Sequence, residues 1–121
     1  MPILDVEMVT DDRSNSETWA KQIADAAGTA FRTGEGTVWV KLRFVSPANY
    51  AENHVPGYST PRPVFVSILC RDLPPEAEMQ VLMRGLADRI GEILQIPAPW
   101  VHILFQPPAR GRIGFGGEWL E

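Results

Sequence analysis

The chain has 121 residues, of which 45% are hydrophobic and 21% are charged, and this balance is typical of one globular domain rather than of a disordered or fibrous segment. The formal net charge of -4 argues against a general nucleic-acid binder, although the eleven lysines and arginines could still gather locally. One cysteine and two histidines exclude an internal disulfide and argue against a metal site.

The sequence carries no sign of a membrane span or an export signal. No stretch approaches the roughly 18 consecutive apolar residues that a membrane-spanning helix needs, and the first residues lack the basic and apolar regions of a signal peptide. We therefore expect a cytoplasmic protein that binds neither membranes nor nucleic acid.

The first half of the chain predicts a strand, a helix and a second strand. An apolar run over residues 2–9 predicts the first strand. Ser14 and Glu17 match a capping box, and the apolar positions of residues 19–31 share one helical face. Residues 37–45 alternate and predict the second strand. Its two faces carry Val40, Leu42 and Phe44 on one side, and Trp39, Lys41 and Arg43 on the other.

The second half repeats this order after an irregular connector, residues 49–62, which has room for one short strand. Residues 63–69 predict a strand, and Pro74 and Pro75 mark the start of a helix whose apolar spacing continues to residue 94. Residues 100–106 predict the last strand, and a glycine-rich tail follows at 110–121.

A constant shift superimposes the two halves without a gap. The aligned pairs are Pro2 with Pro63, Trp39 with Trp100, Val40 with Val101, Leu42 with Ile103, Phe44 with Phe105 and Pro47 with Pro108. This agreement predicts that one β-α-β unit is duplicated, at about 2–48 and 63–109, inside a single domain of residues 1–121. Because the crossover in such a unit is right-handed, its two strands are parallel. The expected fold is α/β (α+β), with a four-stranded sheet and both helices on one face.

The other face of this sheet would have no cover in a single chain. The strands nevertheless carry apolar or aromatic residues on both sides, as the neighbours Ile3 and Leu4, and Trp39 and Val40, show. Large apolar surfaces of this kind are normally buried against a partner. We therefore predict a symmetric oligomer in which sheets pack against sheets.

These features together resemble the tautomerase superfamily. The resemblance lies in the Met1-Pro2 start ahead of a strand, the duplicated β-α-β units and the tail Arg112-Ile-Gly-Phe-Gly-Gly-Glu118. The chain looks like a fused, double-length relative of 4-oxalocrotonate tautomerase (4-OT), and its residues 44–49 and 65–72 are also similar to cis-3-chloroacrylic acid dehalogenase. The resemblance implies a homotrimer of two-unit chains with an amino-terminal proline at the active site.

The position that matches this proline is Pro2, which would carry a free secondary amine once Met1 is removed. An ordinary α-amine has a pKa of about 7.7–8.0 and that of proline is higher, so burial or nearby cations must lower it before the amine can act as a base near neutral pH. In the alternative, Met1 is retained, the proline nitrogen is an amide, and the trimer is not catalytic.

Two residues of the second unit are candidates for binding a substrate carboxylate. Arg71 matches a substrate-binding arginine of the dehalogenase, and its alternative is a solvated ion pair with Asp72. His102 stands where the tautomerase has a strand arginine that contacts substrate, and its alternative is a place in a subunit interface.

Three further cations complete the candidate list. Lys41 and Arg43 lie on the equivalent strand of the first unit and would either face the substrate or form the polar side of that strand. Arg112, in the tail, would line the pocket together with Phe115 or pack between subunits.

The choice of reaction follows from what the dehalogenase pattern lacks here. Its helix histidine, second arginine and tyrosine fall at Ala27, Pro74 and near Leu104, and Glu118 is the one candidate for its tail carboxylate. Proton transfer requires fewer catalytic groups than hydrolysis does, because no water has to be activated. We therefore expect a tautomerase that acts without metal or organic cofactor on a small carboxylate, either a 2-hydroxydienoate or a phenylpyruvate-like acid. A dehalogenase or hydratase of a small unsaturated acid is the alternative.

Overall fold

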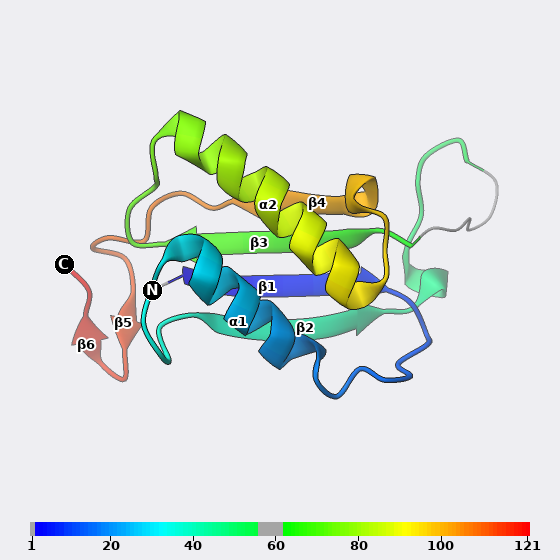
Figure 1. Cartoon of the computed structure of the whole chain (residues 1–121), viewed down its shortest axis with the longest axis horizontal. Helices are drawn as coiled ribbons and strands as arrows, with labels where there is room; N and C mark the ends of the chain where they lie inside the picture. Colours follow the sequence, from blue (N-terminus) through cyan, green and yellow to red (C-terminus); the bar gives the residue numbers. More distant parts are fainter. Residues whose placement is uncertain (1, 56–61) are drawn as a thin grey trace.

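The computed structural model describes residues 2–55 and 62–121; Met1, whose removal the predicted chemistry requires, and residues 56–61 of the connector lie outside them. Two helices lie side by side across one face of a four-stranded sheet, and a small hairpin stands beside one edge (Figure 1). The sheet strands are β1 (Pro2–Val9), β2 (Trp39–Val45), β3 (Val64–Cys70) and β4 (Val101–Phe105). The helices are α1 (Trp19–Phe31) and α2 (Glu76–Leu94), and the hairpin consists of β5 (Gly114–Phe115) and β6 (Glu118–Trp119).

The strand order β2-β1-β3-β4 confirms the predicted fold. Each half contributes a parallel pair, β1 with β2 and β3 with β4, and the two first strands meet antiparallel at the centre. The amino ends of β1 and β2 therefore lie at the same edge of the sheet as the carboxyl ends of β3 and β4. This edge brings together residues from both halves of the chain.

The core lies between the helices and one face of the sheet. Its fully buried members include Leu4 and Val6 from β1, Val64 and Ile68 from β3, Ile23 and Ala27 from α1, and Leu86 and Ile90 from α2. As predicted, Val40, Leu42 and Phe44 turn their side chains toward this core. Alternation along the strands leaves the other residues on the uncovered side of the sheet, which we call the open face.

The predicted start of α1 is wrong. The helix begins at Trp19, and its N-cap residue Thr18 makes no side-chain capping hydrogen bond. Upstream, the Asp12 carboxylate accepts a hydrogen bond of 2.9 Å from the backbone N–H of Ser14. An aspartate that bonds to the chain two residues on favours a turn, so Ser14 is held in a turn and does not cap the helix. A short 3-10 helix, Pro47–Asn49, leads into the connector, and the described residues of the connector form no strand.

The strand register corrects the gap-free alignment of the two halves. Leu4 lies opposite Val40 across β1 and β2, and Val64 lies opposite Val101 across β3 and β4. If Val40 and Val101 are equivalent, then Leu4 corresponds to Val64 rather than to Phe65. A slip of one residue reverses the two faces of a strand, and accordingly Leu4 is 0% exposed whereas Phe65 is 38% exposed. The residue equivalent to Pro2 is therefore Arg62, not Pro63.

The tail folds back on the edge where β1 begins. The ring of Phe115 in β5 meets the ring of Trp39 edge to face, with centroids 5.3 Å apart. Trp39 also donates a hydrogen bond of 3.0 Å from its indole N–H to the carbonyl of Gly36. The hydrogen bond fixes the indole, and the ring contact holds the hairpin near the amino end of β1, where Figure 1 shows it.

Candidate functional site

Pro2 is buried and begins the central strand β1. Its direct partner across the sheet is Cys70, the last residue of β3, so Arg71 is the first residue beyond that pair. Paired residues on neighbouring antiparallel strands have Cβ atoms about 4.5–5.5 Å apart. The register therefore brings Pro2, the predicted base, and Arg71, a predicted substrate-binding residue, to the same edge of the sheet.

Cys70 gives Pro2 a neutral neighbour. The thiol is 7% exposed, and burial raises its pKa because a thiolate would lose its hydration there. A protonated thiol adds no negative charge beside the nitrogen of Pro2. The side chain of Cys70 therefore would not stabilise a protonated amine at Pro2.

Arg71, Asp72 and Arg110 form a cluster of three charges at this edge. Arg71 donates from Nε to Asp72 at 2.9 Å, as its alternative interpretation expected. Arg110 donates to both oxygens of the same carboxylate, from Nε at 2.7 Å and from Nη2 at 2.6 Å. The hydrogen bonds from Arg110 are the main cause of a drop in the pKa of Asp72 from its ordinary 3.8 to about 2. The cluster carries a net charge of about +1, and each of its side chains is roughly half exposed.

Lys41 and Arg43 lie on the open face, further along the sheet. Lys41 Nζ is 3.2 Å from Asp5 Oδ1, and Arg43 approaches both Asp5 and Glu7 at 3.7 Å. The 3.2 Å contact lacks hydrogen-bond geometry, since Asp5 Oδ1 is buried without a hydrogen-bond partner. Two cations and two carboxylates balance here, so this part of the open face offers an anion no net positive charge.

His102 lies opposite Phe65 in the register of β3 and β4, and the two rings are 5.5 Å apart. It borders a small depression of about 210 Å³ between these strands. Phe65 in turn pairs with Glu7, which lies about 16 Å along β1 from Pro2 at roughly 3.3 Å per residue. His102 and Arg43 therefore do not reach Pro2 of the same chain.

Arg112 uses its guanidinium inside the tail. Its Nε donates to the carbonyl of Pro108 at 2.9 Å, and its Nη2 donates to the carbonyl of Pro107 at 3.1 Å. These bonds tie the turn that follows β4. The neighbouring Arg110, which the sequence analysis did not single out, is the tail arginine that reaches Arg71 through Asp72.

The hairpin adds aromatic and acidic groups to the same edge. Trp39 lies opposite Ile3 in the register, next to Pro2, and is 52% exposed. Glu118 pairs with Phe115 across the hairpin, which brings the one predicted tail carboxylate to the neighbourhood of Trp39. Its side chain is exposed, and no contact of it with Pro2 is present among the described residues.

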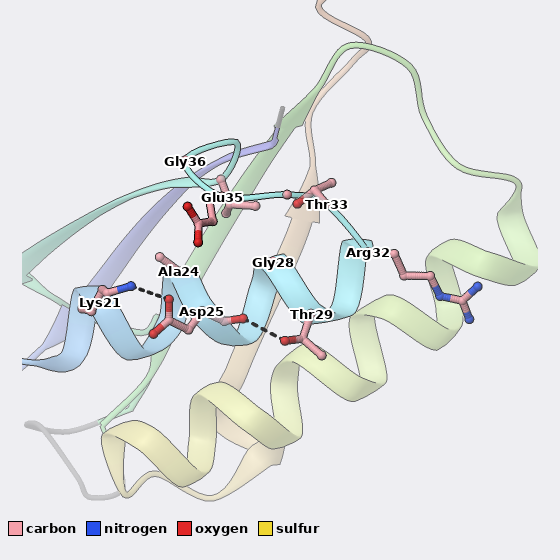
Figure 2. A pocket seen from close by; sticks show the side chains of 11 residues that line it. Lys21, Ala24, Asp25, Gly28, Thr29, Arg32, Thr33, Glu35 and Gly36 are labelled. Carbon is pink, nitrogen blue, oxygen red and sulfur yellow. Dashed lines mark hydrogen bonds and ion pairs between the residues drawn. The ribbon is translucent and has the colours of Figure 1, made fainter.

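A larger groove, with a volume of about 770 Å³, lies elsewhere, between α1 and the loop that leads to β2 (Figure 2). Its charged side chains are partly paired within the helix, since Lys21 donates to Asp25 at 2.6 Å. Figure 2 shows Arg32 directed away from these residues, toward the other helix. None of the predicted site residues lines this groove.

Within residues 2–55 and 62–121, no three histidine, cysteine, aspartate or glutamate side chains come close enough to hold a metal ion. Neither described helix combines the length and the apolar character needed to cross a bilayer.

No protein-family model and no curated protein sequence matches the chain. Its structure, however, is similar to that of fused 4-OT solved as a symmetric trimer, with a TM-score of 0.78 and 14% identity over 96% of this chain and 93% of that one. It is also similar to a macrophage migration inhibitory factor homologue from Prochlorococcus marinus, with a TM-score of 0.74 and 16% identity over 96% of both chains.

A third similar structure is that of FG41 malonate semialdehyde decarboxylase inhibited by 3-bromopropiolate, with a TM-score of 0.73 and 16% identity over 94% of this chain and 88% of that one. At these identities the likeness establishes the fold alone. The chain has the α+β fold of these proteins, and the predicted resemblance to the tautomerase superfamily is confirmed at the level of fold.

Proposed function

We propose that this protein is a tautomerase of the tautomerase superfamily that uses Pro2, freed by the removal of Met1, as a general base for keto-enol proton transfer. The observation that carries the proposal is the register of β1 and β3. It puts a buried Pro2 opposite Cys70 and beside Arg71, at the edge where the sheet has a net positive cluster.

The chemistry follows from this arrangement. Burial and the nearby guanidiniums disfavour a protonated amine, which lowers the pKa of Pro2 toward the operating pH. The neutral amine then accepts the hydroxyl proton of the enol and returns it to the carbon next to the carbonyl that forms, which converts the enol to the ketone; the reverse reaction removes the proton from that carbon. Arg71 binds the substrate carboxylate and stabilises the enolate or dienolate formed between the two steps. This cycle needs no metal and no organic cofactor.

The substrate is a small acid of the 2-hydroxydienoate or phenylpyruvate type. The exposed indole of Trp39 with the adjoining Phe115 supports the aromatic acid, because aromatic side chains bind flat apolar groups with centroids about 4.5–7 Å apart. The cationic cluster supports the carboxylate that both substrate types share.

We further propose that the active form is a cytoplasmic homotrimer. Large apolar side chains, among them Leu104 at 59% exposed, lie on the open face of the sheet. Arg43 and His102 lie too far from Pro2 of their own chain to contact its substrate, so they could serve a site only across a subunit boundary. The similar fused 4-OT structure is itself a trimer.

Intact-mass measurement together with a spectrophotometric enol-ketone assay tests the proposal. The purified protein should lack the mass of Met1 and ketonise the enol of phenylpyruvate. Pro2→Ala should lose most of this turnover while it remains trimeric. A version with an uncleaved amino-terminal tag, whose Pro2 nitrogen is an amide, should be equally inactive. Undiminished turnover in both proteins would exclude Pro2 as the base.

The position of Glu118 favours a second candidate, hydration or dehalogenation of a small unsaturated acid. Glu118 is the tail carboxylate on the hairpin that packs against Trp39, and a carboxylate at such a place could activate water. Glu118→Gln should abolish product formation from a chloroacrylate in that case. The same variant should leave the enol-ketone reaction unchanged.

A further inference from the structure

We infer that Arg110 is a second anion-binding residue of the Pro2 site and that Asp72 is the positioning residue that holds it beside Arg71. The inference rests on the proposed function for the identity of the substrate. It adds Arg110, which the sequence did not indicate, and gives a role to Asp72, which the sequence offered only as an ion-pair partner of Arg71.

The backbone fixes where Arg110 lies. The N–H of Ala109 donates to the carbonyl of Cys70 at 2.9 Å, and the N–H of Arg110 donates to the carbonyl of Arg71 at 3.1 Å. The segment after β4 therefore runs beside the end of β3. Since Cys70 is the partner of Pro2, Arg110 lies within one residue of the same edge position as Arg71.

Asp72 then orients both guanidiniums. Its two oxygens accept the fork of Arg110, through Nε and Nη2, and one of them also accepts Nε of Arg71. A bidentate contact of this kind fixes the plane of the arginine as well as its distance. Both terminal nitrogens of Arg71 and one of Arg110 make no hydrogen bond to Asp72, so these donors can bind a carboxylate ligand. The net positive charge of the cluster survives because two cations share one anion.

Arg112 is a poorer candidate although it stands two residues away. Its Nε and Nη2 already donate to the carbonyls of Pro108 and Pro107. Those carbonyls belong to the turn that carries Arg110, so Arg112 supports the turn. The two arginines of the tail therefore have separate tasks, and substitutions should separate them.

The test compares the enol of phenylpyruvate with that of its methyl ester, which keeps the reacting carbon and lacks the negative charge. Arg110→Ala should lower the acid-over-ester ratio of kcat/KM about tenfold, mainly through the KM of the acid, as expected from the loss of a charge-assisted hydrogen bond. Arg110→Lys, which keeps the charge and loses the fork, should fall between. Arg112→Ala should lower the Tm and should lower the ratio less than Arg110→Ala does, because Arg112 acts only through the turn. Arg89→Ala, which removes the same charge from the exposed side of α2, should change neither.

Asp72→Ala separates positioning from simple charge. Loss of a negative charge alone would raise the acid-over-ester ratio, whereas loss of orientation lowers it. We expect a several-fold fall that Asp72→Glu partly restores. A rise in Asp72→Ala would overturn the positioning role, and an unchanged ratio in Arg110→Ala would overturn the binding role.

Binding of phenylpropanoate, an unreactive carboxylate, followed by calorimetry distinguishes the two proposals. Weaker binding in Arg110→Ala without any Pro2-dependent turnover would leave the anion site standing and remove the proposed function. Turnover that depends on Pro2 but is insensitive to Arg110→Ala would do the reverse.

Discussion

The two glycines of α2 predict opposite results for the same substitution. A Cβ atom on Gly91 would lie 2.6 Å from the carbonyl oxygen of Ile96, and that backbone is held because the N–H of Ile96 donates to the carbonyl of Gly91 at 2.9 Å. A Cβ on Gly85 would meet nothing within 4 Å. Alanine in place of glycine favours a helix by about 1 kcal/mol. At Gly85 this gain is realised in full.

At Gly91 the overlap outweighs the gain. Moving the chain end that follows α2 away from the new methyl group costs about 2–3 kcal/mol, as overpacking of a filled interior does. We expect Gly91→Ala to lower the free energy of unfolding by about 1–2 kcal/mol and Gly85→Ala to raise it by about 1 kcal/mol. The Tm should change in the same directions, by about 4 °C per kcal/mol. Urea unfolding at one fixed protein concentration measures both, since assembly makes stability depend on concentration. A Gly91→Ala protein as stable as Gly85→Ala would refute the close approach of Ile96 to the helix.

Three other predictions concern the edge where β1 begins. Because the pKa of Asp72 is lowered to about 2, its contribution to stability is present above about pH 4 and is lost as the pH falls toward 2; Asp72→Asn should be less stable than the native protein at pH 7, and thermal unfolding should show the gap closing over that range. A gap that stays constant would contradict the ion pairs. Cys70, with its raised pKa and 7% exposure, should react with a disulfide reagent at pH 8 far more slowly in the folded protein than in urea, and equal rates would show that the thiol is not buried. Trp39→Ala should release the hairpin and speed limited proteolysis at Gly116, whereas Leu104→Ala, which removes an equally exposed side chain of the open face, should not.

Periodicity predicted the elements of the sheet and the helices well, because burial on one face produces a regular spacing of apolar residues in the sequence. The alternation of Val40, Leu42 and Phe44 is an example. Two features gave no such periodic signal, namely the turn that competes with the predicted start of α1 and the register of the strands. Asp12 draws Ser14 into a turn, and the chance agreement of Pro2 with Pro63 concealed a shift of one residue between the first strands of the two units.

The candidate site was predictable only in part. Pro2 and Arg71, which the sequence indicated, lie at one edge, but the sequence did not indicate Arg110, because its bond to Asp72 spans 38 residues. A signal for it did exist. Parallel strands that form one β-α-β unit end at the same edge of a sheet, so residues that follow β3 and β4 must meet where β1 begins. The hydrogen bonds are needed to decide which tail arginine contacts the residues that follow β3: Arg110 bonds to Asp72, whereas Arg112 bonds to Pro108.

The corrected register also bears on how many sites one chain can hold. The two β-α-β units give the sheet two similar edges, and at the second edge the residue equivalent to Pro2 is Arg62. The backbone nitrogen of Arg62 is an amide inside the chain and cannot act as a base. That edge instead carries Arg43 and His102, next to the carboxyl end of β2 and the amino end of β4. Under the proposed function, each chain thus contributes one edge with a base and one without, and Arg43 and His102 can serve a site only where another chain brings its Pro2 to them.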